Sequence, residues 1–281
     1  MRKKLLLLLI GTAIILVIAF ELLPRFFIYP PLHRNTPSPA DYIARQKNIL
    51  TGTSISLVVW EHGDRAVPRI ALTFDADMTP GMRFLLDQGV VKSWYNREIK
   101  KTLDRERVPA TIFLGGLWTK TYPMEAKALA NDPFIELGNH SYNHYAFTAG
   151  CYNLPFLSAS KEKTDDVAEA QRIIQITTGV SPKYFRFPGG CFEHVDLETV
   201  AKLGLSIVHW DVVAGDGFNT DTDSIVQAVE SGVQNGSIVV FHIHDGPYAP
   251  KTNDALMRII PDLKKRNFQF VKISELLPDA H

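Results

Sequence analysis

The sequence predicts an α/β fold built on a parallel β-sheet. From Arg69 onward, short apolar runs alternate with longer stretches in which charged and apolar residues follow helical spacing. Strands that alternate with helices in this way form parallel sheets, which are either open or closed into a barrel. The strand candidates are residues 70–74, 110–114, 134–137, 184–187, 205–210, 237–241 and 268–273.

Helical spacing is clearest in residues 95–103 and 165–177. A third helix is expected to end at Val233, with Asp223 or Ser224 as its N-cap, because such side chains accept hydrogen bonds from the free N–H groups of a first turn. Gly236 ends the loop that follows this helix. Residues 54–60 have the composition of a further short strand.

The composition is that of a folded protein without a strong net charge. The chain has 281 residues, of which 46% are hydrophobic, and its 30 basic residues balance its 30 acidic ones. This is enough apolar sequence for a sizeable core. No broad positive field is available to attract nucleic acid, so we expect a neutral or mixed-charge partner.

The N-terminus has the layout of an export signal. Residues 1–4 include three basic side chains, and residues 5–20 are apolar or small before Glu21. Extended to Leu23, the run is at the lower limit of the roughly 17 to 25 residues that span a membrane. No small-x-small cleavage site follows it, so we predict an uncleaved signal anchor over residues 1–23, with the N-terminus inside. The protein would then be membrane-anchored, with its body outside the cytoplasm, in the periplasm or extracellular space.

The segment after the anchor differs from the rest of the chain. Residues 24–66 contain several prolines and no clear periodicity, which predicts a stalk with a peripheral segment. Residues 67–281 are then expected to form a single catalytic domain.

Polar side chains follow several of the predicted strands. Asp75 and Asp77 come at the end of the first one, where alternate residues point to the same side. His140 and His144 are spaced so that one helical turn would place both imidazoles on one face, where they could bind a divalent ion together with an aspartate. Taken singly, either pair could instead be a turn, capping or surface pair.

Three further groups follow later strands. Arg186 could orient a carboxylate, and the N–H of Gly189 could approach an oxyanion, although an ordinary ion pair above a tight turn would look the same. His242 ends an apolar run and is a candidate general acid, since an aspartate can bring its pKa near the working pH. The candidate aspartates are Asp211 and Asp216.

In this order, the clusters resemble those of the polysaccharide deacetylase family, the NodB-homology domain of carbohydrate esterase family four. The resemblance covers residues 67–275, and its most specific part is the run Glu-Leu-Gly-Asn-His-Ser-Tyr-Asn-His at residues 136–144. It implies a distorted (β/α) barrel of seven or eight parallel strands and metal-dependent removal of N-acetyl groups from a cell-envelope or extracellular polysaccharide.

The resemblance also implies a role for each residue. Asp75 would be the general base, oriented by Arg186, and His140 and His144 would bind the metal. His242 would be the acid, supported by Asp211 or Asp216, and the N–H of Gly189 would hold the oxyanion. The expected ion is zinc, with cobalt, nickel or manganese as alternatives.

Two motifs depart from the family pattern, which has adjacent aspartates in the first motif. Ala76 stands where the family has its aspartate ligand, so we expect Asp77 to bind the metal, although two histidines alone or exchanged roles for Asp75 and Asp77 remain open. Asp216 is followed by Gly217 instead of tryptophan. His244 competes with His242 for the role of acid.

These departures leave other functions open. One is a weak or inactive relative that binds polysaccharide, and another is hydrolysis of a different amide or of an O-acetyl ester. Peptidoglycan, chitin-like oligomers and an exopolysaccharide all remain possible substrates. Aromatic residues that could stack on sugar rings or simply pack are Trp118, Tyr142, Tyr145, Phe147 and Phe218.

Cys151 and Cys191 are expected to form a disulfide. Cys151 comes soon after the histidine motif and Cys191 directly after Gly190, so both belong to loops at the same end of the expected barrel. An exported domain would allow them to be oxidised. The bond would stiffen the rim of the cleft.

Overall fold

The computed structural model describes residues 57–277. Its strands form one sheet in the order β1-β6-β5-β4-β3-β2-β8-β7, and β9 pairs separately with β2. Every pairing between these strands is parallel. The strands are β1 (Val59–Trp60), β2 (Arg69–Ala76), β3 (Ala110–Leu114), β4 (Ile135–Asn139), β5 (Tyr184–Phe185), β6 (Ser206–Val208), β7 (Val212–Val213), β8 (Ile238–His242) and β9 (Gln269–Phe270).

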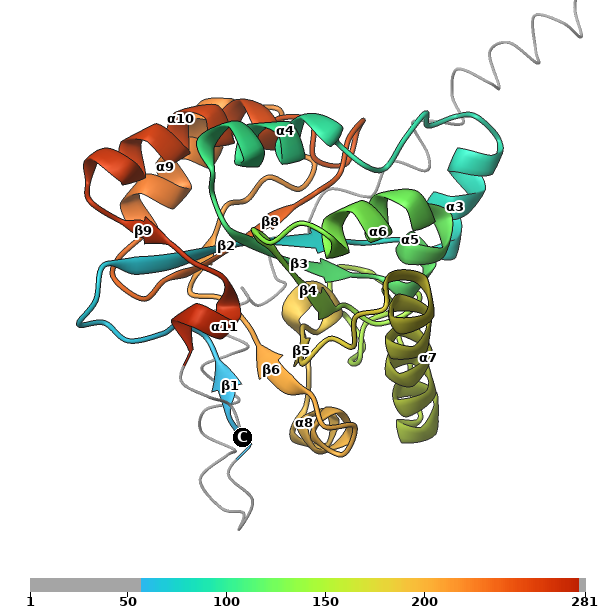
Figure 1. Ribbon diagram of the computed structural model, residues 1–281. Coiled ribbons are helices and arrows are strands. Elements are labelled where there is room, and N and C mark those ends of the chain that lie inside the picture. The colour runs from blue at the N-terminus through green and yellow to red at the C-terminus, as the bar shows by residue number, and fades with distance from the viewer. Residues whose placement is uncertain (1–56, 278–281) are drawn as a thin grey trace, which may run out of the picture. The chain divides into compact units, whose positions relative to one another are not determined.

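Helices connect the strands and cover the sheet (Figure 1). Helices α4, α9 and α10 pack together beside β2 and β8, while α7 packs against α5, α6 and α8. The helices are α3 (Pro80–Asp87), α4 (Arg97–Glu106), α5 (Gly116–Thr121), α6 (Pro123–Ala130), α7 (Ser160–Thr178), α8 (His194–Ala201), α9 (Thr222–Gly232), α10 (Thr252–Lys265) and α11 (Ile273–Leu276), with a short 3-10 turn, η2, at Pro188–Gly190.

The α/β fold with parallel strands is confirmed, and the sheet curls into an incompletely closed (β/α) barrel. The path of the sheet runs from β1 to β7, and these two end strands do not pair with each other within residues 57–277. Each apolar run of the sequence contains a strand. In the last run, residues 268–273, only Gln269 and Phe270 form a strand, β9. The run ends at Ile273, where α11 begins.

The predicted helices are present with small shifts in their ends. Residues 95–103 and 165–177 correspond to α4 and α7. The prediction of Asp223 or Ser224 as the N-cap of α9 was wrong. The cap is Asp221, whose carboxylate accepts hydrogen bonds from the backbone N–H groups of both of those residues.

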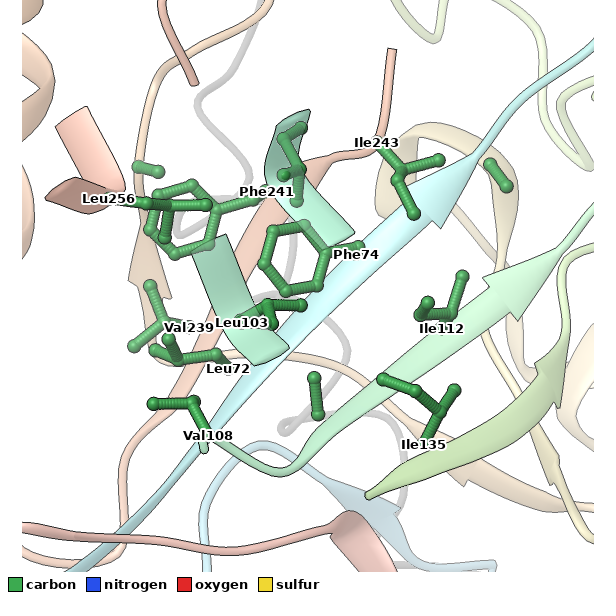
Figure 2. Packing of buried hydrophobic residues seen from close by; sticks show 14 of the residues in the cluster. Leu72, Phe74, Leu103, Val108, Ile112, Ile135, Val239, Phe241, Ile243 and Leu256 are labelled. Atoms are coloured by element: carbon green, nitrogen blue, oxygen red, sulfur yellow. The ribbon is translucent and has the colours of Figure 1, made fainter. Parts of the chain in front are cut away.

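The central strand β2 separates an apolar core from the inner side of the sheet. Ile70, Leu72 and Phe74 point to the cluster formed with the helices, in which Phe74 stacks on Phe241 (Figure 2). Burial of side chains of this size stabilises the fold by about 1.5 to 3 kcal/mol each. Residues alternate between the two faces of a strand, so Asp75 points to the inner side of the sheet.

The edge strand β1 pairs with β6 and lies within the segment that the sequence assigns to the stalk and peripheral region. The predicted anchor over residues 1–23 lies outside the described residues. Of the helices within residues 57–277, none combines the length and hydropathy that a membrane span requires.

Candidate active site

The site lies where β2 and β8 end. Asp75 and His242 are register partners on these neighbouring strands. The Asp75 carboxylate is almost fully buried, and its Oδ1 accepts a hydrogen bond from Nη1 of Arg186 at 2.8 Å. Arg186 has no exposed surface, and its guanidinium lies over the ring of Phe113 at 4.0 Å. A buried arginine held in this way fixes the adjacent carboxylate in one orientation.

Three ligand atoms converge beside this ion pair. Oδ1 of Asp77 is 3.3 Å from Nε2 of His140 and 3.3 Å from Nε2 of His144, and all three side chains are buried. Metal–ligand bonds of about 2.0 to 2.1 Å in a tetrahedral site separate neighbouring ligand atoms by about 3.3 Å. Both distances from Asp77 therefore fit a divalent ion such as zinc, and the ligand atoms of all three residues lie within 4.8 Å of one another.

The hydrogen bonds of these residues support the same conclusion. The Nδ1 of His140 donates to the carbonyl oxygen of Arg186 at 2.9 Å, so Nε2 is the nitrogen that faces Asp77. Oδ1 of Asp77 and Nε2 of His140 are buried atoms that find no hydrogen-bond partner within residues 57–277. Burial lowers the pKa of His144 to about 4, so its imidazole is neutral, which is the form that binds metal. A cation between these atoms would satisfy them.

The histidines do not lie on a helical turn, so that prediction was wrong. Residues 140–144 form an irregular loop in which Ser141 and His144 have positive φ angles of 65° and 54°. Oδ1 of Asn139 accepts the N–H of Ser141, and the N–H of Gly116 donates to the carbonyl of Ser141. These hydrogen bonds take the place of those of a helix. The loop still holds the ring centroids of His140 and His144 5.0 Å apart.

Asp166 of α7 also holds this loop, and sequence analysis missed it. Its carboxylate accepts the N–H of Tyr142 at 2.7 Å and that of Asn143 at 3.3 Å. Asp166 shares a buried helix face with Ala170 and Ile173, and burial raises its pKa. A charged residue at an apolar position of the predicted helix was the signal that could have revealed it.

His242 is paired with Asp216. Its Nδ1 lies 2.8 Å from Oδ1 of Asp216. The other carboxylate oxygen of Asp216, Oδ2, accepts a hydrogen bond from the hydroxyl of Thr252. Burial alone would lower the pKa of His242, but the charge and hydrogen bond of Asp216 outweigh it and raise that pKa to about 10. Nε2 of His242 lies 3.8 Å from Oδ2 of Asp77, and the side chain is 25% exposed. His242 can therefore present a proton to a group bound in the site.

Asp211 does not support His242, which corrects one of the two alternatives from the sequence. Its carboxylate accepts hydrogen bonds from Arg65, Ser237 and the N–H of Ile238. Ile238 is the first residue of β8 and His242 is the last, so the two aspartates lie at opposite ends of that strand. At about 3.3 Å per residue, roughly 13 Å separates these ends.

His244 has both ring nitrogens in structural hydrogen bonds. Its Nδ1 donates to the carbonyl oxygen of Trp94 at 2.7 Å, and its Nε2 accepts the N–H of Asp77 at 2.9 Å. The side chain is fully buried. Of the two histidines, His242 has the geometry of the proton donor.

Gly189 lies in the loop that follows Arg186, in a left-handed conformation with φ at 64°. A Cβ at this position would come within 2.7 Å of the Cys151 sulfur, so a side chain is excluded there. Cys151 and Cys191 form a disulfide with their Cα atoms 6.0 Å apart, as predicted. The bond joins the segment after the histidine loop to the segment after Gly190.

The aromatic candidates separate by burial. Trp118 and Phe147 belong to the core, whereas Phe218 is 49% exposed and has a positive φ of 56°. The Phe218 ring packs at 4.6 Å from that of Tyr248, which sequence analysis did not single out. Tyr248 donates its hydroxyl hydrogen to Oδ2 of Asp77 at 2.8 Å.

Residues 62–208 match the sequence model of the family described as Polysaccharide deacetylase. The chain belongs to this family. The matched range includes Asp75, Arg186 and the cluster of Asp77, His140 and His144. The resemblance recognised in the sequence is thereby confirmed.

Two relatives illustrate the range of this deacetylase family. A chitooligosaccharide deacetylase of Sinorhizobium fredii is 30% identical over 226 residues, which cover 76% of this chain and 92% of that protein. A peptidoglycan-N-acetylglucosamine deacetylase of Bacillus cereus is 28% identical over 215 residues, which cover 75% of this chain and 89% of that protein.

A solved structure with the same fold is that of a carbohydrate esterase family 4 pseudoenzyme from Bacillus anthracis. The two chains are 24% identical, and their superposition has a TM-score of 0.65. It covers 80% of this chain and 70% of that structure. Members with this deacetylase fold thus include a protein described as a pseudoenzyme.

Proposed function

We propose that this polysaccharide deacetylase is an active, metal-dependent hydrolase that removes N-acetyl groups from amino sugars of a cell-envelope or extracellular polysaccharide. The observation that carries the proposal is the convergence of Asp77, His140 and His144. Two ion pairs lie beside this cluster: Asp75 with Arg186, and Asp216 with His242. The relatives that act on chitooligosaccharide and peptidoglycan support this substrate class.

The site has the parts that amide hydrolysis needs. A divalent ion held by Asp77, His140 and His144 would supply Lewis acidity to the acetyl carbonyl. Asp75, oriented by Arg186, takes a proton from the water that attacks the carbonyl carbon. His242 gives its proton to the amine as the carbon–nitrogen bond breaks, which yields acetate and the free amino sugar.

The oxyanion that forms during the attack needs a hydrogen-bond donor. We assign this role to the backbone N–H of Gly189, which directly follows Arg186, Phe187 and Pro188 in the loop at the site. Cys151, which forms the disulfide with Cys191, packs against Gly189 and limits the movement of this loop. A donor of this kind contributes about 2.7 to 4 kcal/mol to transition-state stabilisation.

Zinc is the ion we propose, because two imidazoles and one carboxylate with an open position for water are a common zinc set. The same three donors accept cobalt, nickel or manganese. Metal analysis of the purified protein, followed by reconstitution of the stripped protein with each ion, distinguishes them.

A polysaccharide-binding relative without activity is the second candidate. It is motivated by Ala76, which replaces the family's aspartate and belongs to the apolar core on the other face of β2. Successive side chains of an extended segment point to opposite sides, so Ala76 points away from the site and Asp77 points toward it. Asp77 therefore completes the set of three candidate ligands despite the substitution. This geometry favours the active enzyme.

Membrane anchoring and an extracytoplasmic location are also proposals. They are supported by the basic and apolar residues 1–23 and by the Cys151–Cys191 disulfide, since disulfides persist in oxidising compartments. Protease treatment of intact and lysed cells, combined with extraction of the membrane fraction at high pH, tests both statements.

The activity test measures acetate released from chitooligosaccharides, peptidoglycan and an acetylated exopolysaccharide. We expect release from at least one of them, loss of release with a chelator, and recovery with zinc. If the zinc-loaded protein bound glycan but released no acetate from any of the three, the binding protein would be the correct interpretation.

A further inference from the structure

Asp77 lies just beyond the end of β2, where no strand pairing among the described residues fixes its backbone. The last residue of β2 is Ala76, which aligns with Leu114 of β3. A metal ligand in such a position needs other contacts to hold its carboxylate in one place. The structure supplies two such contacts, and both come from the segment that follows β8.

The first contact is made by His244. Its Nε2 accepts the backbone N–H of Asp77 at 2.9 Å, while its Nδ1 donates to the carbonyl oxygen of Trp94 at 2.7 Å. These two bonds require the neutral tautomer with hydrogen on Nδ1. His244 thus replaces the missing strand partner as the acceptor for Asp77.

The second contact is made by Tyr248. Its hydroxyl donates to Oδ2 of Asp77 at 2.8 Å. The remaining oxygen, Oδ1, is the one that lies 3.3 Å from the imidazoles of His140 and His144. The hydroxyl therefore fixes the orientation of the carboxylate, with one oxygen bound to Tyr248 and the other facing the ligand cluster.

The Tyr248 ring is itself held on several sides. Its centroid lies 4.7 Å from that of His244, 5.2 Å from that of His242 and 4.6 Å from that of Phe218. A ring packed in this way cannot swing its hydroxyl away without disturbing its neighbours. The hydrogen bond to Asp77 is therefore pre-organised.

We propose that His244 and Tyr248 are positioning residues that hold Asp77 as a metal ligand, one through its backbone and the other through its outer carboxylate oxygen. The inference rests on the proposed metal site and deepens it. It explains how Asp77, placed beyond the strand end, serves as the ligand in a chain that has alanine at position 76.

The test is Tyr248→Phe, which removes only the hydroxyl. Zinc affinity is measured by competition with a chromophoric chelator, and the absorption spectrum of the cobalt-loaded protein is recorded. We expect a dissociation constant about 10 to 100 times higher than that of the wild type, as for other residues that orient a metal ligand, and a changed cobalt spectrum. Tyr95→Phe is the matched control, since its ring packs on Trp118 and Tyr122 in the core.

A second variant, His244→Phe, tests the backbone contact. We expect weaker zinc binding again, with a melting temperature measured in parallel to separate a local effect from global unfolding. If Tyr248→Phe kept the wild-type affinity and cobalt spectrum, the inference would be overturned. A change in KM alone, with unchanged metal affinity, would also overturn it and assign Tyr248 to the substrate.

The same data separate this inference from the proposed function. Should the wild-type protein itself fail to bind one zinc or cobalt ion, the metal site is wrong and both proposals fall. Stoichiometric binding by the wild type, with equal binding by Tyr248→Phe and His244→Phe, leaves the proposed function intact and refutes the positioning role alone.

Discussion

Asp75 and His242 are register partners in the ladder between β2 and β8, so the proposed base and the proposed acid stand side by side at the ends of adjacent strands. Each is held by a buried partner of opposite charge, Arg186 for Asp75 and Asp216 for His242. The charge and hydrogen bond of Asp216 outweigh the effect of burial and raise the pKa of His242 to about 10, so its imidazole is protonated beside the Asp75 carboxylate. This is the pairing that base-assisted attack and acid-assisted departure require.

The first prediction separates the roles of Asp75, in β2, and Asp77, just beyond its end. Asp75→Asn is expected to lower kcat by about 10² to 10⁴, because it removes a general base, while zinc binding stays stoichiometric. Asp77→Ala is expected to abolish stoichiometric zinc binding, because it removes a ligand. Metal content and acetate release are measured for both variants. The opposite pattern would exchange the two roles.

The second prediction concerns pH. With His242 as the proposed acid, activity should fall as the pH rises through its pKa. Burial lowers this pKa, but the charge and hydrogen bond of Asp216, together with the charges of Asp77 and Asp75, raise it to about 10. Asp216→Asn removes the carboxylate that raises this pKa, and the basic limb of kcat/KM against pH should move down by about 1 unit or more. Asp211→Asn is the control, because Asp211 contacts the opposite end of β8, and it should leave the limb in place. If Asp216→Asn left the basic limb of kcat/KM at the same pH as in the wild type, the assignment of His242 as the acid would be contradicted.

The third prediction tests Asp166. An asparagine there keeps one acceptor oxygen and presents an NH₂ group to the second backbone N–H, so we expect Asp166→Asn to weaken zinc binding about tenfold and to destabilise the fold by about 1 to 3 kcal/mol. Chelator competition and urea denaturation measure the two effects. Asp165→Asn changes a neighbouring exposed aspartate paired with Lys161 and should be close to neutral. Equal behaviour of the two variants would refute the role of Asp166.

The fourth prediction concerns the disulfide. Replacing both Cys151 and Cys191 by serine should lower the free energy of unfolding by about 3 to 4 kcal/mol, because the bond closes a chain segment with a sequence separation of 40 residues. Equilibrium denaturation with and without reductant measures this. Reductant should destabilise the wild type and leave the double variant unchanged. A wild type that is insensitive to reductant, with its thiols shown to be free, would contradict the prediction.

Most strands were predictable because they are short apolar runs in the sheet, and the candidate residues were predictable because they follow the ends of those runs. The two-residue edge strand β7 was not predicted, because it is too short to form such a run. Asp77 could be preferred over Ala76 from the alternation of a strand. Once the strand ends were recognised, the convergence of Asp75, Asp77 and His242 followed from the parallel sheet.

The other parts of the site depend on contacts that no local pattern encodes. The histidine loop was assigned to a helical turn because the spacing of His140 and His144 fits one, but hydrogen bonds from Asn139, Gly116 and Asp166 determine its real conformation. Tyr248 comes from a loop without periodicity. The choice between Asp211 and Asp216 depended on which end of β8 each one reaches.

The most direct test is a crystal structure of the zinc-loaded protein with anomalous data collected on both sides of the zinc absorption edge. We expect one anomalous peak within about 2.0 to 2.2 Å of Oδ1 of Asp77 and of Nε2 of His140 and His144, with Asp75 still bound to Arg186. A peak elsewhere, or none at these three atoms in protein that releases acetate, would contradict the account.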